Sequence, residues 1–179
     1  LGFLADIDPN DVTSNLLKII EGEFTEDRRF FLEGSIQSKK AEFLALNEIV
    51  IHSGKVAQLI EFNLFIDDTF VYRQKADGLI ISSPTGSTAY SLSGGGPIVH
   101  PNVDTIILVS MLPHNLNTSP LLVEAGSKIR VDLEKQKAIL SFDSHENFPL
   151  RGNSSINISK AKSSLILIHP EGQDFFASC

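Results

Sequence analysis

Residues 77–101 interrupt the regular pattern of this chain, and they read Asp77-Gly-Leu-Ile-Ile-Ser-Ser-Pro-Thr-Gly-Ser-Thr-Ala-Tyr-Ser-Leu-Ser-Gly-Gly-Gly-Pro-Ile-Val-His-Pro101. An apolar run typical of a buried strand leads into a turn at residues 84–86, and we expect a short helix at residues 87–93. Glycines and a proline then end this helix. If Ser87 or Thr88 starts the helix, its first backbone N–H groups point outward and suit a polar or anionic group. The alternative role for the hydroxyls of this loop is a helix cap on the surface.

Short runs in which apolar and polar residues alternate surround this loop and predict strands. Before them, Asp8-Pro9-Asn10-Asp11 is a helix-start signal, the apolar residues from Val12 to Ile20 have helical spacing, and Gly22 ends the pattern. Asp67-Asp68 predicts a hairpin turn. We expect strands at residues 30–34, 43–51, 62–66, 70–72, 78–82, 105–109, 128–133, 137–142, 155–159 and 164–168. We therefore predict one mainly β domain over residues 1–179, a layered, sandwich-like fold with a few short helices.

Composition limits the classes of function. The 179 residues include 15 Lys and Arg against 22 Asp and Glu, which gives a net charge of −7. A nucleic-acid or anionic-membrane surface needs a basic excess, so we expect neither partner. Cys179 is the single cysteine, which excludes a disulfide framework and favours a reducing compartment, the cytoplasm. The apolar runs are shorter than the roughly 18 residues of a membrane-spanning helix.

Basic residues are absent from one long part of the chain. Between Ala76 and Ser127 there is no Lys or Arg, and the acidic residues there are Asp77, Asp104 and Glu124. A stretch of this length without basic side chains is not a typical solvated face. Three roles stay open for it, namely core, oligomer interface and the wall of a binding site.

Several familiar catalytic and nucleotide-binding motifs are missing. Gly86-Ser87-Thr88 is not the Gly-x-Ser-x-Gly elbow of serine hydrolases, and neither a phosphate-binding loop nor a Gly-x-Gly-x-x-Gly fingerprint is present. The 5 histidines show no metal-ligand spacing. We therefore expect no metal site in this chain and disfavour a stand-alone dehydrogenase.

Polar residues in apolar surroundings remain as candidates for a binding site. Asn47-Glu48 lies at the centre of the apolar run at residues 43–51, where one of two neighbouring side chains in a strand faces inward and needs a partner. Asp77 borders the base-free stretch, and the hydroxyl-rich loop after it contains Tyr90. A carboxylate suits the paired hydroxyls of a ribose, while amides and hydroxyls can recognise the edge of a base. The structural alternatives are a strand-edge hydrogen bond for Asn47-Glu48 and an Asp-Gly turn for Asp77.

These residues resemble the motifs of a known family. Asn47-Glu48, within Ala-Leu-Asn-Glu-Ile-Val-Ile, resembles the short Asn-Glu motif of NAD kinases of the bacterial type. Residues 77–101 are similar to the longest and most distinctive segment of that family, and Pro113-His114-Asn115-Leu116 resembles its Pro-His-Ser-Leu. Two further segments resemble the family near the ends of this chain, namely Leu1-Gly2-Phe3-Leu4 and residues 169–176. The resemblance covers essentially the whole chain.

The resemblance implies the C-terminal, β-rich, NAD-binding domain of such a kinase. In the family an N-terminal α/β domain carries a Gly-Gly-Asp-Gly motif for the ATP phosphates and supplies the catalytic aspartate, and this chain contains no such motif. The family transfers the γ-phosphoryl group of ATP to the 2′-hydroxyl of the NAD adenosine ribose, which makes NADP, and it uses a divalent metal, for which we expect Mg²⁺. We therefore expect no catalytic residue in this chain and no activity from it alone. The alternative is a non-catalytic β-rich module for nucleotide binding or oligomerisation.

The resemblance also implies which residues bind NAD. They are Asn47, Glu48, Lys75, Asp77, Thr85, Thr88, Ala89, Tyr90, Ser91, Leu92 and Ser93. Asn47 and Glu48 would hold ribose and base groups, and Asp77 would bind the other end of NAD. Members of the family form homo-oligomers, for which we expect a dimer or tetramer, and share this site between subunits, so that Asp77 would serve a neighbour's ligand. His145 is a further candidate, although residues 142–145 depart from the commoner Asp-Gly-Gln or Asp-Ser-Gln.

Overall fold

A computed structural model describes residues 7, 9–36, 42–55, 58–115, 118–171 and 175. The features expected from residues 1–4, Asp8, Leu116, Phe176 and Cys179 lie outside these described residues. The chain divides into two compact units, Leu1–Arg29 with Ser164–Cys179, and Phe30–Ser163. Every candidate site residue belongs to the second unit, and one domain over the whole length stays a prediction.

Helix α1 (Val12–Glu21) belongs to the first unit and confirms the helix expected from the sequence. Gly22 ends it with a φ of +93°, a left-handed conformation that glycine adopts without strain. The backbone N–H of Gly22 donates to the carbonyl of Ile19 at 3.1 Å. No residue of α1 is buried, and the side chain of Ile20 is 79% exposed. The first unit also contains the outer ends of β1 (Phe24–Ile36) and β12 (Ser155–Pro170).

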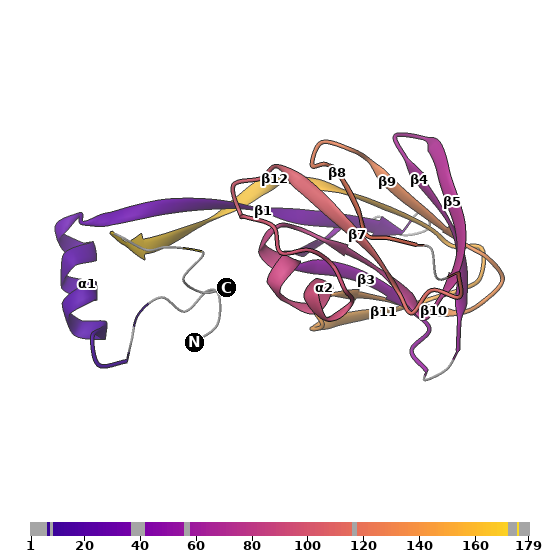
Figure 1. The fold of residues 1–179 in the computed structure, drawn as a ribbon, viewed down its shortest axis with the longest axis horizontal. Coiled ribbons are helices and arrows are strands. Elements are labelled where there is room, and N and C mark those ends of the chain that lie inside the picture. Colours follow the sequence, from indigo (N-terminus) through magenta and orange to yellow (C-terminus); the bar gives the residue numbers. More distant parts are fainter. Residues whose placement is uncertain are drawn as a thin grey trace. The chain divides into compact units, whose positions relative to one another are not determined.

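The described strands form two six-stranded sheets, ordered β2-β1-β12-β9-β4-β5 and β11-β10-β3-β6-β7-β8 (Figure 1). Their bounds are β2 Glu42–Ala45, β3 Glu48–His52, β4 Ile60–Ile66, β5 Thr69–Ala76, β6 Gly78–Ser82, β7 Thr105–Met111, β8 Leu121–Glu124, β9 Ile129–Leu133, β10 Ala138–Phe142 and β11 Glu146–Leu150. The strand pairs of the second sheet are antiparallel. The structure confirms a mainly β, layered fold with few helices.

The main core lies between the two sheets of the second unit. Alternate residues of the strands point into it, for example Ile49 and Ile51 from β3 and Phe62 and Leu64 from β4. These side chains are 0% exposed. Burial of this kind stabilises each side chain by roughly 1.5–3 kcal/mol, so the second sheet is a rigid support for groups on its outer face.

A second, smaller core lies on the outer face of the second sheet. It joins Val50, Ile80, Ile107 and Val109, which alternate with main-core residues, to Val99 from the segment after β6. This segment contains the 3₁₀-helix η1 (Thr85–Thr88) and the short helix α2 (Tyr90–Ser93). The distinctive sequence stretch is therefore placed on the outer face of the sheet (Figure 1).

Several elements differ from those expected. The helix expected at residues 87–93 is divided by Ala89, whose φ of −99° and ψ of −129° are not helical. The strands expected at 155–159 and 164–168 are one strand, β12. The apolar run at 43–51 is divided into β2 and β3. The sequence did not predict β8 or the edge strand β11, which is only five residues long and contains Pro149.

The Asp67-Asp68 hairpin is confirmed. Both residues have positive φ values, +48° and +61°, and they connect β4 to β5. The backbone N–H of Lys128 donates to the Asp67 carboxylate at 2.8 Å, which fixes the turn. No helix in the described part of the chain is long and apolar enough to cross a membrane.

Candidate functional site

Asn47 and Glu48 lie at a bend between β2 and β3 on the second sheet. Glu48 is the first residue of β3 and pairs with Ser82 of β6. Its side chain lies on the outer face of the second sheet, on the same side as that of Val50, and the residue is only 4% exposed, while Asn47 is half-buried. The expectation that one of these two polar residues is buried is confirmed.

The bend is held in place by the carboxylate of Asp143, in the turn between β10 and β11. Asp143 accepts hydrogen bonds from the backbone N–H groups of Leu46 at 2.7 Å, Asn47 at 2.8 Å and Glu48 at 3.0 Å. These bonds draw the backbone out of the strand ladder, which is why the apolar run is divided there. The sequence analysis did not identify Asp143 as a residue of the site.

The segment after β6 contacts the same bend from the other side. The Ser83 hydroxyl donates to the carbonyl of Leu46 at 2.6 Å, and the Ser83 backbone N–H donates to the carbonyl of Asn47 at 2.9 Å. A Cβ at Gly86 would lie 2.3 Å from the Asn47 carbonyl oxygen, so only glycine permits this approach. The Asn-Glu motif and the distinctive loop therefore form one structural unit.

Burial makes the Glu48 carboxyl group unusual. Desolvation, together with the nearby charge of Asp143, raises the pKa of Glu48 from 4.5 to about 7, and a hydrogen bond from the Tyr90 backbone N–H lowers it in part. One of its carboxyl oxygens has no hydrogen-bond partner among the described residues. A buried acceptor without a partner is costly to the fold and is typical of functional sites.

The loop residues predicted to bind NAD differ in accessibility. Thr85 is 8% exposed, and Ser91 is fully buried with a hydroxyl that has no partner among the described residues. Thr88 and Ala89 are half-buried. The accessible members are Tyr90, Leu92 and Ser93. Direct contact of Ser91 with a ligand stays a prediction.

A pocket of about 240 Å³ lies beside Tyr90 on the outer face of the second sheet. It is lined by Val50, His52, Tyr90, Ser141, Ser144 and Asn147. Glu48, Val50 and His52 are alternate residues of β3 and therefore share a face. Burial lowers the pKa of His52, which favours a neutral ring. The sequence analysis predicted only Tyr90 of this lining, because the other side chains come from separate strands.

Lys75 and Asp77 lie at the opposite end of the β3–β6 pair from Glu48. Gly78, next to Asp77, pairs with His52, which is four residues along β3 from Glu48, or about 13 Å at about 3.3 Å per residue. Lys75 is exposed, lies 3.7 Å from the Glu61 carboxylate, and lines a different pocket of about 250 Å³ with Arg73 and other residues. Within one chain the structure does not bring Lys75 and Asp77 together with Glu48.

His145 lies in the same turn as Asp143 and is exposed. A ring nitrogen of His145 contacts the backbone carbonyl of Asp143. Ser144, the neighbouring residue of this turn, lines the pocket. A ligand contact from His145 stays a prediction.

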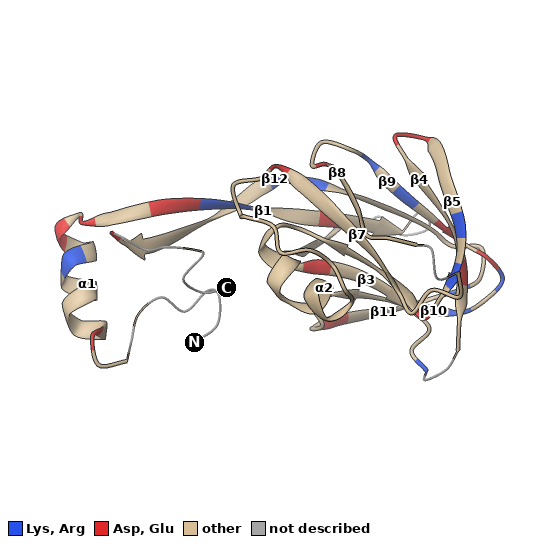
Figure 2. Cartoon of the chain, viewed as in Figure 1, with Lys and Arg blue, Asp and Glu red and all other residues tan. Residues whose placement is uncertain are grey.

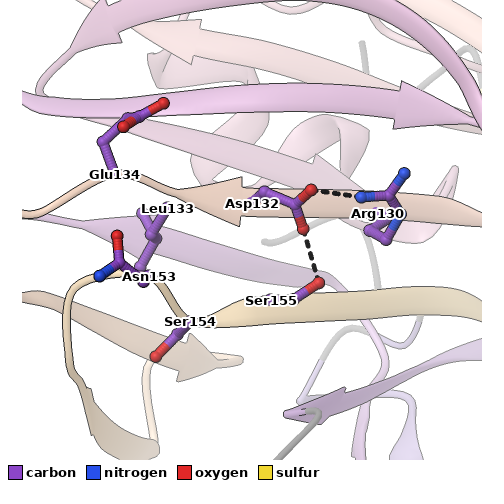
Figure 3. A pocket seen from close by; sticks show the side chains of 7 residues that line it. All are labelled: Arg130, Asp132, Leu133, Glu134, Asn153, Ser154 and Ser155. Carbon is purple, nitrogen blue, oxygen red and sulfur yellow. Dashed lines mark hydrogen bonds and ion pairs between the residues drawn. The ribbon is translucent and has the colours of Figure 1, made fainter.

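A third pocket, of about 480 Å³, lies on the first sheet (Figure 3). Asp132 is bonded there both to Arg130 and to the hydroxyl of Ser155, the latter at 2.6 Å. Glu134 accepts from the side-chain amide of Asn63 at 3.0 Å. The acidic side chains of this pocket, Asp132 and Glu134, therefore have partners, and none of the residues that line the pocket belongs to the predicted site.

The base-free stretch contributes to both the core and the site. It spans β6, η1, α2, β7 and β8, and Figure 2 shows no basic residue on the labelled elements α2, β7 and β8. β6 and most of β7 are buried, whereas α2 presents Tyr90 to the pocket. No group of three or more His, Cys, Asp or Glu side chains that could hold a metal ion occurs in the described ranges.

A known domain family matches residues 46–170, from the Asn47–Glu48 bend to the end of β12, and its description is ATP-NAD kinase C-terminal domain. The chain belongs to this NAD kinase family. The match includes Asp143 and all of the predicted contact residues, so the candidate site lies within the family domain. The resemblance inferred from the motifs is confirmed.

Relatives of the NAD kinase family extend over the whole chain. An NAD kinase from Teredinibacter turnerae is 44% identical over 100% of this chain and 63% of its own length. The structure of yeast NADH kinase complexed with NADH has a TM-score of 0.91 at 27% identity and covers 99% of this chain and 56% of that one. An NAD kinase from Archaeoglobus fulgidus in complex with ATP has a TM-score of 0.82 at 31% identity and covers 95% of this chain and 65% of that one. The chain therefore spans less than two thirds of each of these relatives.

Proposed function

We propose that this chain is the NAD-binding domain of an NAD kinase. The longer protein would transfer the γ-phosphoryl group of ATP to the 2′-hydroxyl of the NAD adenosine ribose and release NADP. The main support is the buried Glu48 carboxyl group, which has one oxygen without a partner among the described residues and lies within the family match. A ribose hydroxyl or a base amino group is a donor that would satisfy this oxygen.

The neighbouring residues divide the recognition of NAD among them. The Asn47 amide offers both donors and an acceptor, which suits the polar edge of a base or a ribose. Tyr90 is 41% exposed and offers an aromatic face on which a base can stack. The backbone N–H groups and hydroxyls of η1 and α2 would line the adenosine part of the ligand.

Lys75 and Asp77 bind NAD in this proposal from a second location. Because Asp77 adjoins the end of β6 that is about 13 Å along the strands from Glu48, either one extended NAD molecule reaches both ends or a neighbouring subunit supplies Asp77. We favour sharing between the subunits of a homo-oligomer, a dimer or tetramer located in the cytoplasm. Exposed apolar side chains near the site, Leu92 at 40% and Ile98 at 44%, support such a contact surface.

Phosphoryl transfer needs positive charge around the migrating group and a carboxylate or other group that orients the nucleophile. The pocket beside Tyr90 contains no Lys or Arg. The described residues also contain no group of three or more His, Cys, Asp or Glu side chains that could hold a metal ion. We propose that Mg²⁺ accompanies the ATP phosphates, and that the chain alone binds NAD without producing NADP.

Calorimetric titration of NAD into the 179-residue chain tests this proposal. We expect saturable binding, and about tenfold weaker binding by Glu48→Gln at pH 7.5, because a hydrogen bond to a charged acceptor is lost. Incubation of the same chain with NAD, ATP and Mg²⁺ should give no NADP.

Glu134→Gln is the matched control, because it removes a carboxylate from the pocket on the first sheet. It should leave NAD affinity unchanged. Equal binding by Glu48→Gln and the unaltered chain would contradict the assigned site, and steady NADP formation would contradict the expected inactivity.

A further inference from the structure

The β10–β11 turn is built around Asp143. Asp143 and Ser144 both have positive φ values, +46° and +59°, and with His145 they make a tight three-residue connection between the strands. β10 pairs directly with β3, with Phe142 opposite Ile49. This register places the turn next to the Asn47–Glu48 bend.

Asp143 both accepts hydrogen bonds from the bend and donates one to it. Its carboxylate accepts three backbone N–H groups, from Leu46, Asn47 and Glu48, at distances between 2.7 and 3.0 Å. Its own backbone N–H donates to the carbonyl of Glu48 at 3.1 Å. Three donors that converge on one carboxylate fix both the position and the direction of the backbone.

We propose that Asp143 is a positioning residue of the NAD site, which it serves by holding the backbone of Leu46–Glu48 so that the Asn47 and Glu48 side chains face the ligand. This inference rests on the proposed function. Asp143 itself has no role in contacting NAD. Its carboxylate is committed to the bend, and the effect on the ligand passes through Asn47 and Glu48.

The charge of Asp143 gives the proposal a second readout. The groups that act on the Glu48 carboxyl are Asp143 from the β10–β11 turn and the Tyr90 backbone N–H from α2. Ser82, opposite on β6, is neutral, and His52, on the same face of β3, has its pKa lowered by burial. If the negative charge of Asp143 is removed, the pKa of Glu48 should fall below 7 but stay above 4.5, since burial is the larger cause.

Asp143→Asn tests the inference, because it keeps the shape of the side chain and removes its charge. Amide hydrogen exchange should become at least about tenfold faster at Leu46, Asn47 and Glu48 while the amide of Ile81 in β6 is unchanged. NAD affinity measured by calorimetry should fall about ten- to a hundredfold. Asp68→Asn is the control, since Asp68 also has positive φ in a tight hairpin turn, and its side chain is 97% exposed.

The two readouts separate the inference from the proposed function. Unchanged exchange at the three amides, or NAD affinity equal to that of Asp68→Asn, overturns the role of Asp143. If the unaltered chain binds no NAD, the proposed function fails. The pKa of Glu48, measured by carbon-13 NMR titration of its carboxyl group, and the amide exchange rates then still decide whether Asp143 holds the bend and raises that pKa. Should Asp143→Asn not fold, Asp143→Glu, which displaces the carboxylate by one methylene, is judged by the same measurements.

Discussion

The burial of the Glu48 carboxyl group makes the stability of the fold depend on pH. It is 4% exposed, and its pKa is raised from 4.5 to about 7. In the unfolded chain the same carboxyl group ionises near 4.5, so between these two values the native protein binds more protons than the unfolded chain. The stability associated with protonated Glu48 is complete below pH 4.5 and is lost as the pH rises to about 7, by about 3 kcal/mol.

Glu48→Gln removes this pH dependence. The free energy of unfolding of Glu48→Gln, minus that of the unaltered chain, should rise by about 2–3 kcal/mol between pH 5 and pH 8. Urea unfolding of both proteins at the two pH values measures the difference. Glu134→Gln should show no comparable rise, and a constant difference for Glu48→Gln would contradict the burial of an ionising carboxyl group.

At the residue scale, the sequence pattern predicted the site only where polar residues interrupt apolar runs. Asn47 and Glu48 stood out for this reason, and the burial of Glu48 is confirmed. Asp143 did not stand out, because a carboxylate before a turn is ordinary and its partner Glu48 is 95 residues away. Its role depends on the pairing of β10 with β3, which no local pattern shows.

The element that completes the site is the segment of η1 and α2, and it is placed by close backbone contact. Gly86 in η1 packs against the bend so tightly that a Cβ would lie 2.3 Å from the Asn47 carbonyl oxygen and 2.6 Å from the Ser82 hydroxyl. The η1–α2 segment and the Asn47–Glu48 bend are therefore in direct backbone contact. A change that separates them should affect stability and ligand binding together.

Gly86→Ala is such a change. We expect a loss of about 1–3 kcal/mol in the free energy of unfolding, because the new methyl group meets backbone that cannot move aside, and weaker NAD binding. Gly126→Ala is the matched control, since the nearest atom to its Cβ would be 3.9 Å away. Chemical denaturation and calorimetry measure the two effects, and equal stability of the two variants would contradict the proposed close packing.

The elements themselves were predictable to the extent that their pattern is local. Alternation predicted β4, continuous apolar runs predicted β6 and β7, and the helical stripe with Gly22 predicted α1. The division of the run at 43–51 was not predictable, because it coincides with hydrogen bonds from Asp143, a residue of a distant segment. The break at Ala89 has no signal in the local sequence pattern. β11 contains Pro149 and is stabilised as a strand by its pairing with β10.

At the scale of the whole molecule, the distribution of charge has a structural explanation. The base-free stretch forms three neighbouring strands of the second sheet, β6, β7 and the edge strand β8, and the segment on its outer face. Figure 2 shows basic residues on β5 and β9 of the other sheet. The chain spans 63% of the Teredinibacter turnerae relative. The proposed recognition of riboses and bases by this domain, with the ATP phosphates bound outside it, requires no basic excess and agrees with the net charge of −7.

The central claim is that NAD binds at the Asn47–Glu48 bend beside Tyr90. Titration of NAD into the isotope-labelled chain, followed by two-dimensional amide NMR, tests it most directly. We predict progressive shifts at Asn47, Glu48 and residues 90–93, with shifts at Asp77 if one ligand reaches both ends or a neighbouring subunit shares the site. Binding that leaves Asn47, Glu48 and Tyr90 unshifted, or that shifts only the residues around Asp132 in the pocket on the first sheet, would contradict the claim.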